Sequence, residues 1–327
     1  MSKVEKALKR ARAERKFALV PVRNAPSSTD DVSLRLPAGA GSDGAAGELE
    51  ARVHSSGAIA LMRENQVRSR SELEAKRVIY PEMPENAVTD AFRAIRTRIL
   101  QKTLKRNCVI MVSSAVPESG NTFVATNLAA AFAFDAGMTA LLVDCNLRKP
   151  KLHEMLFENA ARGLTDYLEN SEIDISQIIY SAGIERLRVI PAGGRREIPG
   201  EYFTTVRMKR LLENVRLRYA ERFIIIDAPP MIETADTQIL AELCDYVLLN
   251  VPYGKVTDSQ IERCLKAVDT KKLLGVVFNE EPRVAPIRWG GIAHDSWAIV
   301  HAWLNRHAAF LMKFLRKNSG SAGNRAD

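Results

Sequence analysis

The sequence contains no apolar run as long as the roughly 18 residues that a membrane-spanning helix needs, so we expect no membrane span. Its opening, MSKVEKALKRARAERKF, also lacks the apolar core of a secretory signal, which favours a cytoplasmic protein. The four cysteines form no CxxC pair and lie mostly in apolar stretches, so they predict buried, reduced thiols rather than disulfides or a zinc site. The five histidines show no ligand spacing, which gives little support to a metal hydrolase.

The composition is that of a soluble globular protein with a sizeable core: 46% of the 327 residues are hydrophobic and 26% are charged. The formal net charge of +8 is uneven, because residues 283–327 contain seven Arg or Lys and two Asp, a net charge of +5. Such a basic segment predicts an acidic partner surface, either lipid headgroups or nucleic acid. No nucleic-acid recognition motif accompanies the charge, so we favour a lipid surface over nucleic acid.

Composition also divides the chain along its length. Residues 1–17 predict a short basic helix, and residues 18–85 predict a flexible linker whose Gly, Ala, Ser and Pro cannot bury enough apolar area to offset chain entropy. A folded domain is expected over residues 86–282, followed by a basic amphipathic tail over residues 283–327.

Short apolar runs alternate with helical patterns through the predicted domain, which indicates an α/β fold: a parallel sheet with helices on both faces. The expected strands are 108–114, 139–144, 187–192, 222–227, 245–251 and 273–279. The expected helices are 86–104, 122–136, 203–218, 234–243 and 257–268. In such folds ligands bind beyond the carboxyl ends of the strands, and polar motifs of this sequence follow several of those ends.

The first motif, AVPESGNT at residues 115–122, joins a strand to a helix. A phosphate-binding loop reads G-x-x-x-x-G-K-[ST]: backbone amides and the helix N-terminus hold phosphate, the lysine bridges the outer phosphates, and the hydroxyl holds Mg²⁺. The second glycine and the hydroxyl are present as Gly120 and Thr122. Ala115 and Asn121 replace the leading glycine and the lysine. An ordinary strand-to-helix turn is the alternative for this motif taken alone.

Two acidic residues end later strands. Asp144 closes the strand in LLVDCNLRKPKLHEML, and Asn146 stands where a second carboxylate would share a metal and accept a proton. Arg148 and Lys149 follow as candidates for a substitute cation. Asp227 closes FIIID, the position of a Walker B carboxylate that holds the metal, usually through water. Either acid alone can simply close a strand, but the loop and both acids in this order predict a nucleotide site.

In the order SSAVPESGNTFVATNLAAAFA, LLVDCNLRKPKLHEMLF, GLTDYL, FIIIDAPP and LLGVVFN, the sequence resembles the bacterial tyrosine autokinases of capsule and exopolysaccharide synthesis. These are P-loop proteins related to the MinD and ParA ATPases. The resemblance covers about residues 86–282, and the opening MSKVEKALKRA resembles the autokinases of exosortase-type systems. It implies a site for ATP or ADP with Mg²⁺, ring-like self-association, and cyclic phosphorylation of a tyrosine-rich tail. That cycle controls polysaccharide chain length together with a membrane co-polymerase.

The resemblance also implies roles for individual residues. DAFRAIR matches an assembly helix of the family, so Asp90, Arg93 and Arg96 would contact a neighbouring subunit. A solvated helix with an internal ion pair is the alternative for these residues. The residues that match metal positions are Thr122, Asp144 and Asp227. The nucleotide would be held by Pro117, Glu118, Ser119, Gly120, Asn121 and Thr122.

The departures from the family pattern fall on the catalytic positions, which are Asp144, Asn146 and Asn121. Asn121 replaces the lysine that neutralises the transferred phosphoryl group, and Asn146 replaces a second carboxylate. No tyrosine follows Tyr253, so the acceptor tail is missing. Loss of one preorganised charged group typically lowers the rate by about 10²–10³. The sequence therefore predicts that the site keeps its shape and that phosphotransfer is lost or very weak.

Residues 295–317, DSWAIVHAWLNRHAAFLMKFLRK, combine an apolar face with a basic face at helical spacing. We expect this helix to lie in an anionic membrane surface and to hold the protein at the inner membrane. Packing on its own domain or on a partner is the alternative. The membrane contacts would be Trp297, Trp303, Phe310, Phe314, Lys313 and Lys317.

The leading interpretation is a degenerate autokinase-like protein that acts as a regulatory or scaffold subunit in exopolysaccharide synthesis. Its partners would be a membrane co-polymerase that determines chain length, an active kinase paralogue and further copies of itself. One alternative is an active ATP-dependent tyrosine kinase that uses substitute residues. Another is a membrane-associated ATPase of the MinD and ParA type, which the missing lysine compromises equally and from which DAFRAIR points away.

Overall fold

A computed structural model describes six stretches of the chain, all within one compact unit, Gly44–Asp327: residues 67–83, 87–104, 106–156, 161–218, 221–232 and 234–280. The predicted basic helix at 1–17, most of the predicted linker and the predicted membrane-binding tail lie outside the described residues. In the part of the chain that is described, no helix combines the length and the apolar character needed to cross a membrane.

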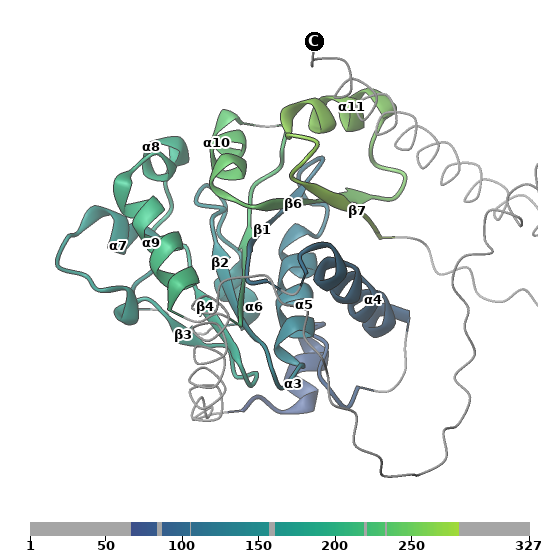
Figure 1. Cartoon of the computed structure of the whole chain (residues 1–327), viewed down its shortest axis with the longest axis horizontal. Helices are drawn as coiled ribbons and strands as arrows, with labels where there is room; N and C mark the ends of the chain where they lie inside the picture. The colour runs from purple at the N-terminus through teal and green to yellow at the C-terminus, as the bar shows by residue number, and fades with distance from the viewer. Residues whose placement is uncertain are drawn as a thin grey trace, which may run out of the picture. The chain divides into compact units, whose positions relative to one another are not determined.

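The described chain forms a seven-stranded sheet flanked by helices (Figure 1). Its strands are β1 (Val109–Ser114), β2 (Thr139–Asp144), β3 (Tyr180–Ser181), β4 (Leu187–Ile190), β5 (Arg222–Asp227), β6 (Tyr246–Pro252) and β7 (Leu273–Asn279). The helices before β5 are α3 (Arg70–Ala75), α4 (Ala87–Lys102), α5 (Asn121–Ala133), α6 (Leu152–Leu156), α7 (Leu164–Glu169), the 3₁₀ helix η1 (Ile175–Gln177), α8 (Pro199–Phe203) and α9 (Val206–Leu217). After β5 come α10 (Ala235–Leu243) and α11 (Asp258–Ala267).

The strand order is β3-β4-β2-β5-β1-β6-β7, and neighbouring strands are parallel except for β3, which runs antiparallel to β4. Because β5 lies between β1 and β2, the register places both Asp144 and Val112 opposite Asp227. The carboxyl ends of these parallel strands therefore meet at one edge of the sheet. This architecture confirms the predicted α/β fold and brings the polar motifs of the sequence together.

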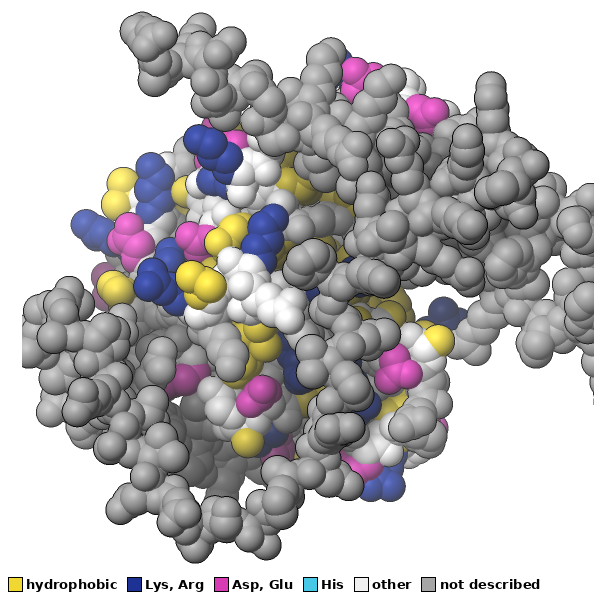
Figure 2. Space-filling view, turned by 45° about the vertical axis from the view of Figure 1, so that its right-hand side comes forward, with side chains coloured by type: hydrophobic (Ala, Val, Ile, Leu, Met, Phe, Trp, Pro, Cys, Tyr) yellow, Lys and Arg dark blue, Asp and Glu magenta, His cyan; other side chains and the backbone are white. Residues whose placement is uncertain are grey.

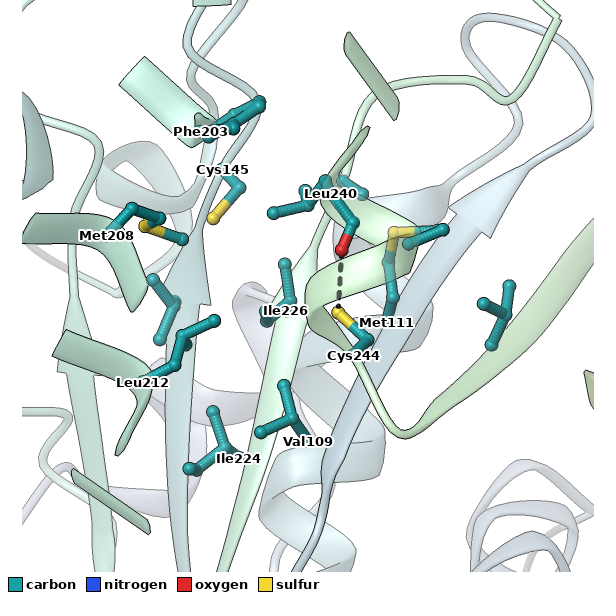
Figure 3. Close-up of a cluster of buried hydrophobic side chains, with 14 of the residues drawn as sticks. Val109, Met111, Cys145, Phe203, Met208, Leu212, Ile224, Ile226, Leu240 and Cys244 are labelled. Atoms are coloured by element: carbon teal, nitrogen blue, oxygen red, sulfur yellow. Dashed lines mark hydrogen bonds between the residues drawn. The ribbon is translucent and has the colours of Figure 1, made fainter. Parts of the chain in front are cut away.

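Alternate residues of the central strands enter two cores, one on each face of the sheet. Val109 and Met111 of β1 pack with residues of α9, α10 and α11, whereas Ile110 and Val112 pack with residues of α4 and α5. Figure 3 shows the first core, where Val109 and Met111 lie near Ile226 of β5. All residues of β1, β2 and β5 are buried, which explains why these strands read as continuous apolar runs.

The four cysteines are buried and free, as the sequence predicts. Burial raises the pKa of the Cys108 thiol to about 12, so this thiol stays protonated at neutral pH. Cys145 and Cys244 belong to the core cluster drawn in Figure 3, where the Cys244 thiol donates to the Leu240 carbonyl at 3.1 Å. These side chains behave as small apolar groups that fill the core.

Residues 67–83 belong to the folded unit, so the fold begins earlier than the predicted linker boundary. Val78 and Ile79 are 0% and 1% exposed. Asn127 of α5 ties this segment to the domain, because its Oδ1 accepts a hydrogen bond from the Ile79 N–H at 2.8 Å and its Nδ2 donates to the Arg77 carbonyl at 3.1 Å. The segment is polar in composition, and its burial depends on contacts with α5 that composition does not reveal.

The predicted helix at 203–218 is confirmed as α9, Val206–Leu217, and a separate short helix that was not predicted, α8, comes just before it at Pro199–Phe203. Thr205 separates them: its extended backbone ends the first helix, and its hydroxyl accepts a hydrogen bond from the Met208 N–H at 3.2 Å, which caps the second. The sequence patterns do not predict the short elements α6, α7, η1 and β3. Each is six residues or fewer, too short for a periodic pattern to emerge.

Candidate functional site

The loop between β1 and α5 turns the chain sharply at Gly120. The φ of Gly120 is +72°, in the left-handed region, and a Cβ here would lie 2.6 Å from Asn279 Nδ2. Both facts require glycine at this position. Glu118 is also left-handed, with a φ of +53°. Within the loop, Ser119 Oγ donates to the Val116 carbonyl at 2.6 Å and closes the turn on itself.

The N-terminal end of α5 has the geometry of an anion cradle. Among the described residues, the backbone N–H groups of 118–122 meet no protein acceptor, and no side chain caps the helix. Helix N-terminal N–H groups, together with the helix dipole, favour a phosphate at such a position. These backbone N–H groups are therefore the part of the loop that has the geometry to face a phosphate.

The side chain of Asn121, at the lysine position, turns back toward the sheet. Its Nδ2 lies 2.9 Å from the Val112 carbonyl, 2.8 Å from Asp227 Oδ1 and 2.9 Å from the Ala228 carbonyl. Three acceptors around one atom identify it as the amide nitrogen rather than the oxygen. Asn121 therefore links the first turn of α5 to the ends of β1 and β5, and presents no cation to the loop.

Asp144 and Asp227 face each other on β2 and β5 and are 0% and 1% exposed. Burial raises the pKa of Asp227 to about 6, against hydrogen bonds from the Thr122 hydroxyl and the Asn121 amide that lower it. Burial, and then the charge of Asp227, raises the pKa of Asp144 well above its usual value, although the Asn146 N–H donates to it at 3.0 Å. The two carboxyl groups therefore resist ionising together.

Three buried acceptor atoms at this edge lack a hydrogen-bond partner within the described structure: Asp227 Oδ2, Asn121 Oδ1 and Asn250 Oδ1. Buried acceptors of this kind cost free energy until a donor or a cation satisfies them. Carboxylate and hydroxyl oxygens are the ligands that Mg²⁺ takes in nucleotide sites. Thr122, Asp144 and Asp227 therefore fit Mg²⁺, whose charge would lower the pKa of both acids.

The segment after β2 carries Asn146 in place of a second carboxylate, and its arginine is paired with another helix. Asn146 is a turn residue: its Oδ1 accepts a long hydrogen bond, 3.4 Å, from the Lys149 N–H. Arg148 forms an ion pair with Asp236 at the start of α10, with Nη2 and Oδ2 2.9 Å apart. The Arg148 guanidinium is thus held by α10, while Lys149 is exposed.

Two asparagines outside the predicted site hold the loop in place. Asn250 Nδ2 and Asn279 Nδ2 both donate to the Ser119 carbonyl, at 2.9 Å and 3.0 Å. They come from β6 and from the last residue of β7, and Asn250 is 0% exposed. The sequence did carry a signal for them, since both are polar residues near the carboxyl end of an apolar strand. We call this pair of contacts the asparagine clamp.

The predicted assembly residues lie on α4. Arg93 is 4.0 Å from Asp90 in an exposed pair and donates to the Pro81 carbonyl at 3.3 Å. Arg96 Nη1 donates to the Ala131 carbonyl of α5 at 2.8 Å. These contacts lie within the chain, as the ion-pair alternative predicts for Asp90 and Arg93, and contacts with another subunit stay a prediction.

The sequence matches the AAA domain family over residues 108–274, about half of the chain. Tyrosine-protein kinase YwqD of Bacillus subtilis is 31% identical over 207 residues, which cover 62% of this chain and 86% of that protein. The chain belongs to the bacterial tyrosine autokinase family. A putative tyrosine-protein kinase, EpsB of Ralstonia solanacearum, is 30% identical over 60% of this chain, and the autokinase-like chain spans only 26% of its length.

Solved structures agree with the autokinase fold. The chimerical protein CapA2B2 superimposes with a TM-score of 0.58 and 28% identity, covering 67% of this chain and 93% of that one. The kinase domain of the Escherichia coli tyrosine kinase ETK also gives a TM-score of 0.58, with 24% identity over 71% of this chain and 89% of that one. The second match, at this lower identity, supports the fold alone.

Proposed function

We propose that this chain is a nucleotide-binding regulatory or scaffold member of the autokinase family in which phosphotransfer is lost or very weak. The observation that carries the proposal is the position of Asn121, a neutral side chain that contacts Asp227 and two backbone carbonyls. The anion cradle at the start of α5 and the pair of acids, Asp144 and Asp227, form around it without a lysine. Nucleotide binding and turnover therefore separate in this protein.

In this proposal the N–H groups of residues 118–122 hold the phosphates of ATP or ADP, and Thr122, Asp144 and Asp227 hold Mg²⁺. When bound, ATP with Mg²⁺ supplies the phosphoryl group and part of the balancing charge. The chain itself offers no lysine at the loop, and Arg148 is paired with Asp236 at 2.9 Å. Absence of one preorganised cation corresponds to a rate lower by about 10²–10³.

An active tyrosine kinase is the second candidate, and one observation favours it. Asp144 is buried, and its pKa is raised by burial and by the charge of Asp227. A buried carboxyl group whose pKa is raised binds a proton more readily than a free one, and a kinase requires a proton acceptor for the hydroxyl that it phosphorylates. Under this alternative, Asn121 would be tolerated because Mg²⁺ carries the charge.

Calorimetric titration and a turnover assay on the same proteins distinguish the two functions. ATP with Mg²⁺ is titrated into the full-length wild type, Asn121→Lys and Asn121→Met, and each protein is then incubated with labelled ATP. Methionine matches lysine in length without its charge, so it controls for loss of the Asn121 hydrogen bonds. We expect the wild type to bind nucleotide and Asn121→Lys alone to gain turnover, by about 10²-fold or more.

Two results would contradict the proposal. Wild-type phosphotyrosine formation equal to that of Asn121→Lys would establish the active kinase, especially if Asp144→Asn abolished it. Absence of nucleotide binding to the wild type, with binding restored in Asn121→Lys, would mean that the cradle does not function without the lysine.

The biological setting proposed here is capsule or exopolysaccharide synthesis at the inner membrane. Its support is the family resemblance and a relative described as a putative tyrosine-protein kinase in cps region of Klebsiella pneumoniae, 26% identical over 69% of this chain. The proposed partners are a membrane co-polymerase, an active kinase paralogue and other copies of the chain. Co-sedimentation with phosphatidylglycerol vesicles tests the membrane role of the tail. Lipid binding that is unchanged on deletion of residues 283–327 would contradict it.

A further inference from the structure

A cavity of about 350 Å³ lies at the far end of α5 from the anion cradle. Its walls come from α3 and the residues that flank it, from the last residue of α5 with Phe134 after it, and from residues 183–186 before β4. Helix α5 therefore joins the two sites, since it begins at the cradle and ends at this cavity (Figure 1). Its 13 residues separate them by about 20 Å. We call this cavity the α5-end pocket.

The charged side chains that line the α5-end pocket already have partners within the chain. Arg68 Nε and Arg186 Nε both donate to backbone carbonyls, at 3.3 Å and 2.9 Å. Each acid of the lining faces an arginine: Glu82 is 3.7 Å from Arg70, and Glu185 is 3.2 Å from Arg186. An ionic ligand would therefore have to displace contacts that already exist.

The apolar walls are the part of the pocket that would gain free energy from an occupant. Leu73, Tyr80 and Ile184 are buried residues of this lining, Phe134 is half-buried, and Val67 is 63% exposed. Covering apolar surface contributes about 25 cal/mol per Å². A cavity of about 150 Å³ with such walls can hold a benzene molecule, so 350 Å³ has room for about two side chains of that size.

The chain itself supplies an apolar segment next to the pocket. Val67, a lining residue, is where the described fold begins. In the sequence before it, GAAGELEARVHSSGAIALMRENQ at 44–66, the longest apolar run is AIALM at 58–62. Met62 is five residues before Val67, and five extended residues span up to about 18 Å, more than the width of a cavity of this volume. The run and the pocket also belong to the same compact unit, Gly44–Asp327.

We propose that residues 58–62 of the same chain occupy the α5-end pocket, where their aliphatic side chains cover its apolar walls. The docked run attaches the N-terminal segment to the folded domain and packs against the end of α5. Because α5 carries the anion cradle at its other end, the run supports the helix on which the cradle depends. The docking does not depend on the proposed function, since neither the run nor the pocket includes a residue of the nucleotide site.

Hydrogen exchange of the full-length protein, followed by mass spectrometry, tests the docking. We expect the backbone N–H groups of 58–62 to exchange at least tenfold more slowly than those of an unstructured chain. Leu61→Asp should remove this protection and also speed exchange at residues 131–135, at the end of α5. Val53→Asp is the matched control, because it places the same charge on an apolar residue outside the run, and it should change neither rate.

Variants of the pocket show whether the run docks there. Phe134→Ser removes an apolar wall and should speed the exchange of 58–62 at least tenfold. Phe123→Ser is its control, because Phe123 is a half-buried phenylalanine of the same helix that does not line the pocket. Val67→Asp, at an exposed lining residue, should have the same effect as Phe134→Ser and replaces it if circular dichroism shows that Phe134→Ser is unfolded.

Three results would overturn the proposal. Residues 58–62 of the wild type could exchange as fast as an unstructured chain. Slow exchange that survives both Phe134→Ser and Val67→Asp would mean that the run packs elsewhere. Slow exchange that is lost on tenfold dilution, as the chain dissociates, would assign the pocket to the run of a second copy. Protection that is unchanged on dilution supports docking within one chain.

Discussion

Asn121 donates a hydrogen bond to Asp227 across 2.8 Å, so a neutral amide contacts the acid at the end of β5. The same amide reaches the carbonyls of Val112 and Ala228, each at 2.9 Å. In a phosphate loop this sequence position carries the cation that projects toward the ligand. Here the side chain joins α5 to the sheet, and its role has moved from charge balance to structure.

Replacement of Asn121 by alanine is therefore expected to destabilise the fold. The change removes the contacts to Val112, Asp227 and Ala228. It takes a donor from the buried Asp227 carboxylate and from the Ala228 carbonyl, whereas the Val112 carbonyl keeps the Ala228 N–H at 3.0 Å. We expect the free energy of unfolding to fall by about 1–3 kcal/mol, measured by urea denaturation. Gln101→Ala, at an exposed position of α4, is the control and should change it by less than about 0.5 kcal/mol. Equal effects in the two variants would mean that the Asn121 link contributes nothing.

The raised pKa of Asp227 makes its ionised form a cost to stability. Burial moves the pKa from its usual 3.8 to about 6, so the folded protein holds this proton more tightly than the unfolded chain. The protonated Asp227 contributes this stability to the folded protein below about pH 4, and the contribution is lost as the pH rises through 6 and the carboxyl group ionises. A shift of this size corresponds to a loss on the order of 3 kcal/mol by neutral pH. Asp227→Asn keeps an acceptor for Asn121 and removes the charge.

We accordingly expect Asp227→Asn to be more stable than the wild type at pH 7.5 and to lose most of this advantage at pH 4.5. Denaturation of both proteins at the two pH values, without nucleotide or metal, measures the difference. Mg²⁺ with ATP should raise the melting temperature of the wild type and not that of the variant. If Asp227→Asn is less stable than the wild type at pH 7.5, the prediction is wrong: the hydrogen bonds to the ionised Asp227 carboxylate then outweigh the cost of burying its charge.

The sequence predicted the sheet because its central strands are buried on both faces. The apolar runs that form β1, β2 and β5 can hardly be placed elsewhere, and the order of the motifs then puts their carboxyl ends together. The segment 67–83 escaped prediction for the opposite reason. Its polar residues resemble the linker before it, and its order comes from Asn127, which lies about 50 residues further along the chain.

The candidate site was only partly predictable for a related reason. The absence of a lysine at Asn121 is visible in the sequence, but the direction in which its side chain turns is not. The asparagine clamp was missed because Asn250 and Asn279 become neighbours of Ser119 only after β6 and β7 join the sheet. A single polar residue near a strand end is common, so only the tertiary structure shows that two of them meet at the same carbonyl.

Asn279 of the asparagine clamp should determine how much free energy of unfolding is lost when Gly120 gains a side chain. Gly120→Ala places a Cβ 2.6 Å from Asn279 Nδ2 and also strains a backbone with a φ of +72°. Asn279→Ala removes the clash and one contact to the Ser119 carbonyl. We expect the double variant to lose less free energy of unfolding than the two single variants lose together. Without the Asn279 side chain, Gly120→Ala costs only the backbone strain, about 1–2 kcal/mol.

A double-mutant cycle measured by urea denaturation gives this coupling directly. Asn250→Ala combined with Gly120→Ala serves as the control, since Asn250 binds the same carbonyl but does not approach the glycine. Additive effects in the Asn279 cycle would contradict the clash. The single variant Asn279→Ala should also bind ADP more weakly, because a looser Ser119 carbonyl allows the N–H groups beside it to leave the cradle.

Arg96 and Asp90 should differ in what they contribute, although both belong to the predicted assembly motif. Arg96 reaches the Ala131 carbonyl at 2.8 Å and is half-buried between α4 and α5, so Arg96→Gln is expected to lower the free energy of unfolding by about 1–2 kcal/mol. Asp90 is exposed and lies 4.0 Å from Arg93, so Asp90→Asn should change stability by less than about 0.5 kcal/mol.

Sedimentation analysis of the same two variants then isolates the assembly role. If Asp90 contacts a neighbouring subunit, Asp90→Asn will reduce the oligomer at unchanged stability, which a purely internal ion pair cannot do. Thr97→Ala is the control: Thr97 is exposed and lies about two turns after Asp90 on α4, so this variant shows whether any substitution on that face of the helix changes oligomerisation. If Asp90→Asn does not change oligomerisation, the predicted assembly role of Asp90 is wrong. The contacts within the chain then account for the motif: Arg96 holds α4 against α5, and Asp90 lies on a solvated face of the helix.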